Sequence, residues 1–270
     1  MKYNLVKKLG VGSAGDAYLL DNGKAIIVGK REDSFGTYKA MYDKMKVLDG
    51  KITTINYPKV YELISPCEDY QYGAIVEECI VGKELRDAVK DMDILEKREV
   101  GKTLAKFVAE IHGLDIVGDK IEEMNINLAK YDRSISILKD YLPSDVIERL
   151  ETLRQDYLSL LERKDFCMTH GDLNEGNIMI DGGRVSGVID FGNMEYYVPE
   201  IDFVHPYFFD RDIYDAMVEN YPRDIDEKEV IFLELVVNIR HFKNIKNFDD
   251  RREKCLNNIQ SLLDRYMSMQ

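Results

Sequence analysis

The stretch of sequence that decides the fold is His170-Gly171-Asp172-Leu173-Asn174-Glu175-Gly176-Asn177, followed thirteen residues after Asn177 by Asp190-Phe191-Gly192. The residues between these two blocks alternate as a β-hairpin, with strands at 177–180 and 185–189 and a Gly-containing turn at 181–184. A hairpin brings its two ends side by side. We therefore expect Asn177 at its entrance and Asp190 at its exit to converge.

Three side chains of this segment match the needs of phosphoryl transfer. That reaction uses a carboxylate to orient the acceptor hydroxyl, and oxygen ligands to hold Mg²⁺ against the phosphates of the nucleotide. Asp172 can supply the first, and Asn177 and Asp190 can supply the second. Asp, Asn and Gly are also frequent in ordinary turns, so each residue alone is a weak signal. Their combination with the N-terminal features below favours phosphoryl transfer.

A glycine-rich segment, Gly10-Val11-Gly12-Ser13-Ala14-Gly15, lies near the N-terminus. A dinucleotide-binding fold is disfavoured, because residues 16–20 alternate like a strand and do not open a helix. A glycine flap over a triphosphate fits better, and the expected nucleotide contacts from it are Gly10, Gly12, Ser13 and Gly15. Lys30 ends the next apolar run, where a strand would direct its ammonium at the phosphates. Alone, Lys30 would be equally consistent with a solvated lysine at a strand end.

The periodicity of apolar residues changes along the chain. Up to about residue 80 it predicts short antiparallel strands at 5–6, 17–20, 25–28, 59–64 and 72–80, with a helix at 36–48. Beyond Gly82 the spacing becomes helical, at 100–111, at 143–161 with Ser144 as its N-cap, and at 231–242 and 255–266. We therefore expect an α+β, bilobal fold with a small sheet-rich N-terminal lobe, residues 1–80, and a larger helical lobe, residues 81–270.

The composition excludes several classes of protein. The 270 residues include 37 basic and 50 acidic side chains, and the net charge of −13 argues against a nucleic-acid partner. The longest apolar run near the N-terminus, 25–28, is far too short to span a membrane. Four scattered cysteines without a CxxC pair and four histidines do not make a zinc framework. We expect a cytoplasmic protein without nucleic-acid or membrane partners.

Taken together, these features resemble the protein-kinase-like superfamily, and specifically its aminoglycoside phosphotransferase and choline kinase branch. The resemblance covers nearly the whole chain. It is carried by the glycine segment 10–15, Lys30, the segment 78–82, the helix end at 104–113, the block 170–177, the Asp-Phe-Gly at 190–192, and residues 199–202. Gly171 stands where protein kinases carry the arginine of His-Arg-Asp. The resemblance implies the fold and the reaction, and leaves the acceptor open.

The resemblance also implies roles for individual residues. Asp172 would be the catalytic base, and Asn177 and Asp190 would bind Mg²⁺. The backbone of Glu78 and of Ile80 would hydrogen-bond the purine edge of ATP or GTP, between which the sequence does not decide.

Further residues are implied as supports of this site. His170 and Asp202 would hold the catalytic loop, and His112 would cap or pack the end of its helix. In this family the helix after Lys30 offers a Glu to pair with that lysine, but residues 36–48 contain none. Asp43 is the best substitute and Glu32 a poorer one, so the partner of Lys30 stays open.

The spacing around the Asp-Phe-Gly separates two kinds of kinase. A regulated protein kinase needs room for an activation loop after this motif. Here only residues 193–198 lie between Gly192 and Pro199, which favours a small-molecule acceptor. A catalytically inert, nucleotide-binding pseudokinase is the alternative, although the lysine, the base and the metal ligands are all present.

The charge distribution suggests what the acceptor is. Residues 195–234 hold twelve acidic and three basic side chains, a net charge of −9, just downstream of the expected metal site. Such a region would attract a small cationic acceptor such as an aminoglycoside-like amino sugar, with Glu195, Glu200 and Asp210 as candidate contacts. Most of these acids could equally form solvated helix faces. The aromatic residues of the same region keep a choline or ethanolamine kinase as the alternative.

Overall fold

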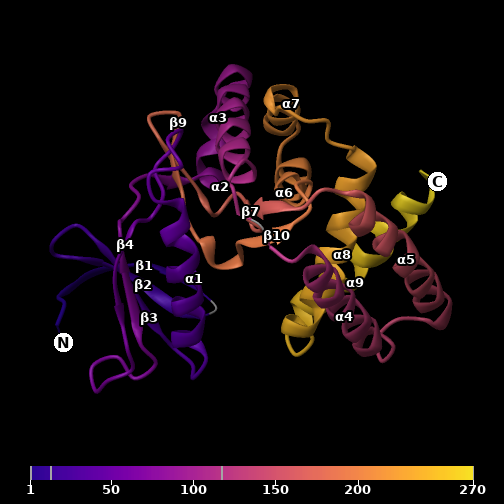
Figure 1. The fold of residues 1–270 in the computed structure, drawn as a ribbon, viewed down its shortest axis with the longest axis horizontal. Coiled ribbons are helices and arrows are strands. Elements are labelled where there is room, and N and C mark those ends of the chain that lie inside the picture. Colours follow the sequence, from indigo (N-terminus) through magenta and orange to yellow (C-terminus); the bar gives the residue numbers. More distant parts are fainter. Residues whose placement is uncertain (1, 13, 117, 270) are drawn as a thin grey trace.

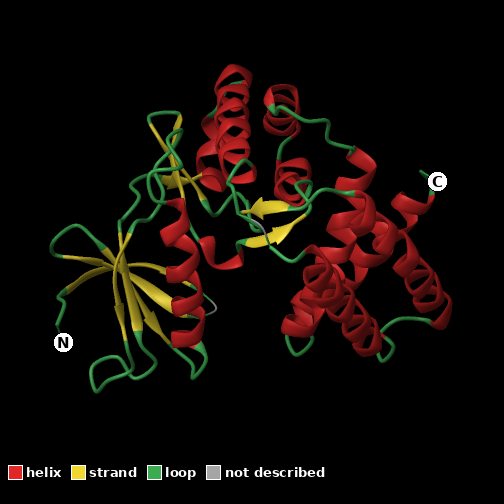
Figure 2. Ribbon diagram, viewed as in Figure 1, coloured by secondary structure: helices red, strands yellow, loops and turns green. Residues whose placement is uncertain are grey.

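The glycine-rich segment belongs to a five-stranded antiparallel sheet at the N-terminal end of the molecule (Figures 1 and 2). The order of its strands is β1 (Leu5–Val11), β2 (Gly15–Leu20), β3 (Ala25–Gly29), β5 (Ala74–Glu77) and β4 (Val60–Ile64). One helix, α1 (Ser34–Leu48), lies between this sheet and the rest of the chain in Figure 1. The computed structural model describes residues 2–12, 14–116 and 118–269.

The alternation of side chains explains how the sheet is buried on both faces. On β3, Ile26 packs with Leu20 and Val76 in a small cluster on one face. Its neighbour Ile27 packs on the opposite face against the main core of the protein. Successive residues of a strand point to opposite faces, so an alternating apolar strand can serve two clusters. The predicted strands are confirmed, although β5 ends at Glu77 and residues 78–82 continue as an extended connection.

The remainder of the chain is mainly helical. The helices are α2 (Leu85–Ala88), the 3₁₀ turn η1 (Val89–Asp91), α3 (Ile94–His112), α4 (Lys120–Leu138), α5 (Ser144–Arg163), α6 (Ile201–Phe209), α7 (Arg211–Asn220), α8 (Glu227–Ile245) and α9 (Asp249–Met267). The four predicted helices are confirmed as parts of α3, α5, α8 and α9, whereas α4, α6 and α7 were not expected. The prediction of Ser144 as an N-cap is wrong by one position, because extended Pro143 precedes the helix and Ser144 is its first residue.

Two small sheets join the helices to the N-terminal part. The predicted hairpin is confirmed as β8 (Ile178–Asp181) and β9 (Arg184–Val188), and β6 (Lys83–Glu84) pairs with its outer edge. Its turn requires two left-handed residues, and Gly182 and Gly183 supply them with φ of 56° and 76°. The second sheet pairs β7 (Cys167–Thr169) with β10 (Glu195–Tyr197), and the 3₁₀ turn η2 (Phe191–Asn193) precedes β10. The block 170–177 therefore lies between two sheets, near the centre of Figure 2.

The main hydrophobic core runs through both parts of the molecule. Met41 and Leu48 of α1 belong to the same buried cluster as Leu104 and Phe107 of α3 and Ile239 of α8. Helix α1, which lies between β3 and β4 in sequence, contacts β4 and β5 of the sheet and also η2 of the C-terminal part. None of the helices in the described ranges is long and apolar enough to cross a membrane.

Gly101 provides a test of this packing. A Cβ on Gly101 of α3 would overlap the carbonyl oxygen of Ile213 and lie 2.7 Å from the Cβ of Ala216 on α7. We expect Gly101→Ala to lower the free energy of unfolding by about 1–3 kcal/mol through overpacking, despite the better helix propensity of Ala. Urea denaturation measures this change.

The matched control for that variant is Gly36→Ala in α1, where a Cβ would meet nothing within 4 Å. Here the gain in helix propensity, up to about 1 kcal/mol, is unopposed, and stability should be unchanged or higher. Equal stability of the two variants would show that α3 and α7 are not in close contact at this point.

Candidate active site

The carboxylate of Asp172 is held by three side chains from different parts of the chain. Asn174 Nδ2 donates to its Oδ1 over 2.7 Å, and Asn193 Nδ2 donates to its Oδ2 over 3.1 Å. The Nε2 of His205, on α6, lies 3.4 Å from Oδ1. Burial by itself would raise the pKa of Asp172, but the contacts with His205 and Asn174 outweigh it and lower the pKa to about 2. The group is therefore a carboxylate at neutral pH.

Asp202 fixes the backbone from which Asp172 projects. Its two carboxylate oxygens accept the amide hydrogens of His170 over 2.8 Å and of Gly171 over 2.7 Å. The Nε2 of His112, the last residue of α3, lies 3.0 Å from the same carboxylate, and its Nδ1 is 2.7 Å from the hydroxyl of Tyr221. Asp202 is fully buried, and the hydrogen bonds and charges of these groups outweigh desolvation and lower its pKa. His112 thus packs within the protein and links α3 to α6.

His170 packs under the same loop. Its Nε2 lies 3.2 Å from the carbonyl oxygen of Ile189, and the centre of its ring is 4.7 Å from that of Phe191. The ring is fully buried, and this burial lowers its pKa. His170 is therefore a neutral ring that connects the loop to the Asp-Phe-Gly segment.

Asn177 and Asp190 lie at the same end of the hairpin. Ile189 donates its amide to the carbonyl of Asn177 over 2.8 Å. Asp190, the next residue, therefore lies near Asn177, which immediately precedes β8. The side chain of Asn177 donates through Nδ2 to the carbonyl of Asp172 over 2.9 Å, which leaves its amide oxygen as the acceptor end. Asp190 adopts φ 62° and ψ 66°, a positive φ found at no other non-glycine residue in the described ranges. Such a strained backbone directs the carboxylate at a defined point.

The charges around this point favour a cation. Desolvation and the negative charge of Asp172 raise the pKa of Asp190, although solvent reaches its side chain. Desolvation and the charge of Asp190 likewise raise the pKa of Glu77, at the end of β5, to about 8. Three acidic groups therefore share one region with too little positive charge. An amide oxygen and a carboxylate are hard oxygen donors of the kind that Mg²⁺ takes, so Asn177 and Asp190 fit this ion.

Helix α1 holds the glycine-rich segment through hydrogen bonds to its backbone. Ala14 accepts hydrogen bonds through its carbonyl from Ser34 Oγ over 2.6 Å and from the hydroxyl of Tyr38 over 3.1 Å. A Cβ on Gly15 would overlap that hydroxyl and the carbonyl of Val28, so only glycine fits there. Gly10 lies in β1, and the amide of Gly12 donates to the carbonyl of Gly15 over 2.8 Å. Ser13 lies outside the described residues.

The extended connection 78–82 is fixed between the sheet and the hairpin. Glu78 donates its amide to the carbonyl of Lys59 over 2.9 Å, and Ser186 donates its hydroxyl to the carbonyl of Val81 over 2.6 Å. The Ile80 side chain approaches the backbone of the hairpin at Gly187, where an added Cβ would lie 2.7 Å from it. The connection therefore has a defined backbone path.

The partner of Lys30 comes from the sheet and not from the helix. Its Nζ lies 2.8 Å from Oδ1 of Asp16 on β2, and Lys8 of β1 contacts the other oxygen of that carboxylate over 2.6 Å. Asp43 instead pairs with Lys39, one turn earlier on α1, at 2.8 Å. The partner that the sequence left open is therefore Asp16, and neither of the substitutes considered, Asp43 and Glu32, takes this place. Strand β2 lies directly beside β3, whereas Asp43 lies more than two turns into α1.

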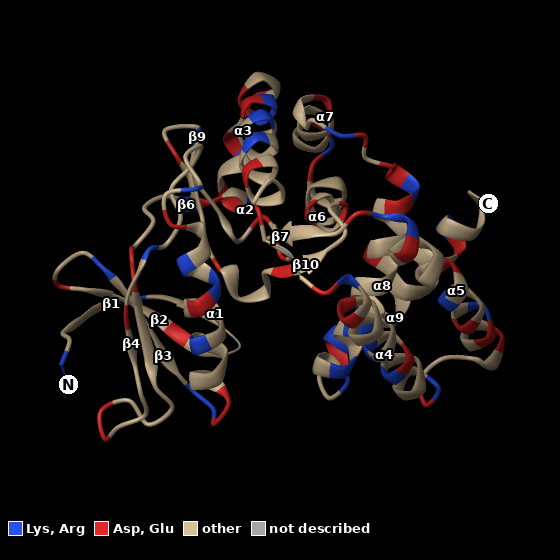
Figure 3. Cartoon of the chain, in the orientation of Figure 1, with Lys and Arg blue, Asp and Glu red and all other residues tan. Residues whose placement is uncertain are grey.

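Two of the three proposed acceptor contacts are engaged elsewhere. For Glu200, whose side chain is buried, the expectation is wrong, and Asp210 already has other partners. Glu200 is buried and contacts the ammonium of Lys164. Asp210 caps α7 through the amides of Asp212 and Ile213 and pairs with Lys97 at 2.8 Å. Figure 3 shows acidic and basic residues intermixed along α3, α4 and α5. Lys97 of α3 and Lys164, which follows α5, are the bases that meet these two acids of the stretch 195–234.

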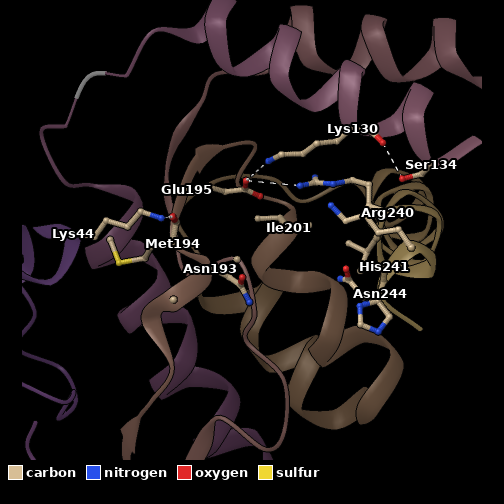
Figure 4. Close-up of a pocket in the computed structure, with 14 residues that line it drawn as sticks. Lys44, Lys130, Ser134, Asn193, Met194, Glu195, Ile201, Arg240, His241 and Asn244 are labelled. Atoms are coloured by element: carbon tan, nitrogen blue, oxygen red, sulfur yellow. Dashed lines mark hydrogen bonds and ion pairs between the residues drawn. The ribbon is translucent and has the colours of Figure 1, made fainter. Parts of the chain in front are cut away.

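Glu195 does line a cavity. The cavity has a volume of about 420 Å³ and is bounded by α1, α4, α8 and the segment 192–195 (Figure 4). Gly171, which precedes Asp172, and Asn193, which contacts the Asp172 carboxylate, are part of its wall. The cavity thus reaches the catalytic loop.

None of the three side chains that touch Asp172 was expected to do so. Asn174 lies in the block 170–177, whereas His205 and Asn193 lie outside it. His205 lies three residues after Asp202, and residues at this spacing share one face of a helix. That spacing is the signal from which His205 could have been found. Asn193 directly follows the Asp-Phe-Gly, and its sequence position alone carries no signal for its contact with Asp172.

Comparisons with known proteins identify the family and the fold. The family model described as the phosphotransferase enzyme family matches residues 6–228. Hydroxylysine kinase of Mus musculus is 25% identical over 139 residues, which span 44% of this chain and 36% of that protein. Among solved structures, the ADP-bound aminoglycoside phosphotransferase APH(2'')-Ib has a TM-score of 0.74 at 20% identity, covering 97% of this chain and 93% of that one. The gentamicin complex of APH(2'')-IIa has a TM-score of 0.76 at 20% identity, covering 97% and 92%. The chain belongs to the phosphotransferase enzyme family.

Proposed function

We propose that this protein is a small-molecule kinase that transfers the γ-phosphate of ATP or GTP to a hydroxyl group of its acceptor. The observation that carries the proposal is the carboxylate of Asp172, whose pKa is about 2 and which three side chains hold beside Asn177 and Asp190. An ionised carboxylate in a fixed position is what the acceptor hydroxyl needs for its orientation.

Asp172 orients the acceptor and receives its proton. The hydroxyl donates a hydrogen bond to the carboxylate, which aligns the oxygen lone pair with the phosphorus. Because phosphoryl transfer passes through a loose transition state, the hydroxyl loses its proton late, and a weakly basic carboxylate suffices. Asn174 and Asn193 keep the two carboxylate oxygens in position during this step.

Asn177 and Asp190 would hold Mg²⁺, with their amide and carboxylate oxygens as ligands. The ion, when bound, would neutralise charge on the phosphates. The strained backbone of Asp190 and the hydrogen bond from Asn177 to the Asp172 carbonyl fix both ligands relative to the base.

The nucleotide would lie between the glycine-rich segment and the connection 78–82. Gly10, Gly12, Ser13 and Gly15 would cover the phosphates, Lys30 would contact them, and the backbone of Glu78 and Ile80 would bind the purine. Solved structures of similar fold are complexes with ADP, ATP or GDP, which supports nucleotide binding by this protein. We assign residues 1–80 to this nucleotide-binding lobe and 81–270 to the lobe that binds the acceptor.

The acceptor is a small molecule. The segment 193–198 is short, and residues 195–197 of it form β10, so it provides no platform for a peptide. The relatives named above are described as kinases of hydroxylysine or of aminoglycosides. The acid-rich stretch 195–234 suggested a cationic acceptor. Of the three contacts proposed for it, Glu195 is the one that lines the cavity.

Replacing the base tests the reaction. We expect Asp172→Asn to reduce kcat by at least about 10²-fold, because the amide cannot accept the proton, and to leave nucleotide affinity nearly unchanged. Steady-state kinetics and calorimetric titration with nucleotide measure the two quantities. Unchanged turnover, or loss of nucleotide binding in a folded variant, would show that Asp172 is not the base.

Replacing a metal ligand tests the Mg²⁺ site. We expect Asp190→Ala to raise the Mg²⁺ concentration required for half-maximal activity by at least about tenfold, since a charged ligand is lost. The control is Asp181→Ala at the exposed tip of the same hairpin, which should keep the wild-type requirement. The same Mg²⁺ dependence in both variants would remove Asp190 from the site.

The contact between His205 and Asp172 can be tested by titration. Burial lowers the pKa of His205, but the contact with Asp172 outweighs this and, with the charges of Glu234 and Glu175, raises the pKa above its ordinary value. The charged contact is therefore complete at low pH and is lost as pH rises through the His205 pKa. We expect Asp172→Asn to lower that pKa, measured by NMR of the imidazole, whereas Asp181→Asn leaves it unchanged. A pKa insensitive to Asp172→Asn would show that the contact is absent in solution.

A further inference from the structure

The charged side chains that line the cavity beside the loop 170–177 are mainly basic. Lys44 reaches it from α1, Lys130 from α4, and Arg240 and Lys243 from α8, with His241 next to them (Figure 4). Glu195 is the one acidic residue among the described residues that form its wall. These bases come from parts of the sequence up to about two hundred residues apart. The cavity therefore carries positive charge, although the stretch 195–234, which contributes Glu195 to its wall, is rich in acids.

Glu195 compensates this positive charge weakly. Its Oε2 lies 3.9 Å from Nζ of Lys130 and 4.0 Å from Nη2 of Arg240, near the outer limit for an ion pair. Glu123 of α4 also interacts with Lys130 and Lys44, but burial raises the pKa of its carboxyl. Two acids therefore face four bases.

The positive charges of the cavity act on Lys130 in particular. Burial lowers the pKa of Lys130, and the positive charges of Arg240 and Lys243 lower it further. Burial also lowers the pKa of Lys44, whose ammonium donates to the carbonyl of Met194. Like charges held together in a partly buried cavity attract an anion, which relieves their repulsion.

We infer that this cavity binds an anionic group of the acceptor, a carboxylate or a phosphate, through Lys130, Arg240 and Lys243, while the acceptor hydroxyl points to Asp172. The inference rests on the proposed function and names the class of its substrate: small hydroxyl compounds that carry a negative charge.

The position of the cavity supports this assignment. Asn193 forms part of its wall and donates to the carboxylate of Asp172, so one residue touches both the anion subsite and the base. A cavity of about 420 Å³ has room for a compound of metabolite size. Arginine and lysine bind carboxylates and phosphates through charge-assisted hydrogen bonds, which gives orientation as well as affinity.

A nucleotide-release screen with three matched sets of acceptors tests the substrate class. The sets are hydroxylated amino and carboxylic acids, sugar phosphates, and amino sugars with several amines and no anionic group. We expect turnover in the first or the second set, and which one responds distinguishes carboxylate from phosphate. Turnover in the amino sugars alone would overturn the inference and leave the proposed function standing.

Variants of the cavity connect that turnover to its bases. Lys130→Gln combined with Lys243→Gln should raise KM for the anionic acceptor at least about tenfold, with kcat and the nucleotide KM nearly unchanged. The control pair, Lys139→Gln with Arg149→Gln, removes the same charge from the exposed surface of the helical part. Equal KM values in the two double variants would overturn the inference.

Direct binding separates the inference from the proposed function. Malonate, which has no hydroxyl to phosphorylate, and inorganic phosphate are titrated calorimetrically into the wild-type protein and both double variants. Binding of either anion that is weakened at least tenfold in the cavity variant and kept in the control supports the anion subsite, even if every acceptor set is inert and the proposed function fails. No binding of either anion to the wild-type protein, or equal binding to both variants, would overturn it. Lys243→Glu, at an exposed position, repeats the test if the double variant does not fold.

Discussion

The catalytic loop depends on one buried carboxylate. Asp202 accepts two consecutive backbone amides, from His170 and Gly171, and meets the ring of His112 with the same group. Removing one partner from a buried, hydrogen-bonded charge of this kind costs about 3–5 kcal/mol. Asp172, the proposed base, is the next residue after these two. Asp202 therefore orients the base through the backbone, without contacting its side chain. Helices α3 and α6 are tied together by the same carboxylate.

Charge of opposite sign surrounds this loop on two sides. Towards the hairpin, Asp172 and Asp190 repel each other and raise the pKa of Asp190. Towards the cavity, Lys130 and Arg240 repel each other and contribute to a lowered pKa for Lys130. The first side suits the cation that Asn177 and Asp190 would hold, the second side suits the anionic group of the proposed acceptor, and Asn193 lies at their border. The metal ion and the acceptor's anionic group would thus be held on opposite sides of the loop.

Contacts between residues close in sequence could be predicted, whereas contacts between distant residues could not. Asp172, Asn177 and Asp190 belong to one loop and one hairpin, so local spacing was enough to bring them together. Lys30 meets Asp16 because of the register in which β2 and β3 pair. The pattern of apolar residues in the sequence does not predict that register.

The same reason explains the errors about the acceptor. Glu200 and Asp210 are close to the site in sequence, yet their charges are taken up by Lys164 and Lys97 from α5's end and α3. The bases of the cavity come from three helices, one of which, α4, was not expected at all. A count of charges along the chain records neighbours in sequence, whereas the sign of a cavity depends on neighbours in space.

Gly171 carries a consequence for how such a protein can evolve. Its φ is 76°, and a Cβ there would overlap the carbonyl oxygen of Asn193. An L-amino acid at this position would meet both backbone strain and a steric clash. The arginine that protein kinases carry beside the catalytic aspartate, and with it a pocket for a regulatory phosphate, is therefore not reachable here by a single substitution. The loop would first have to change its backbone path to accept a side chain at this position.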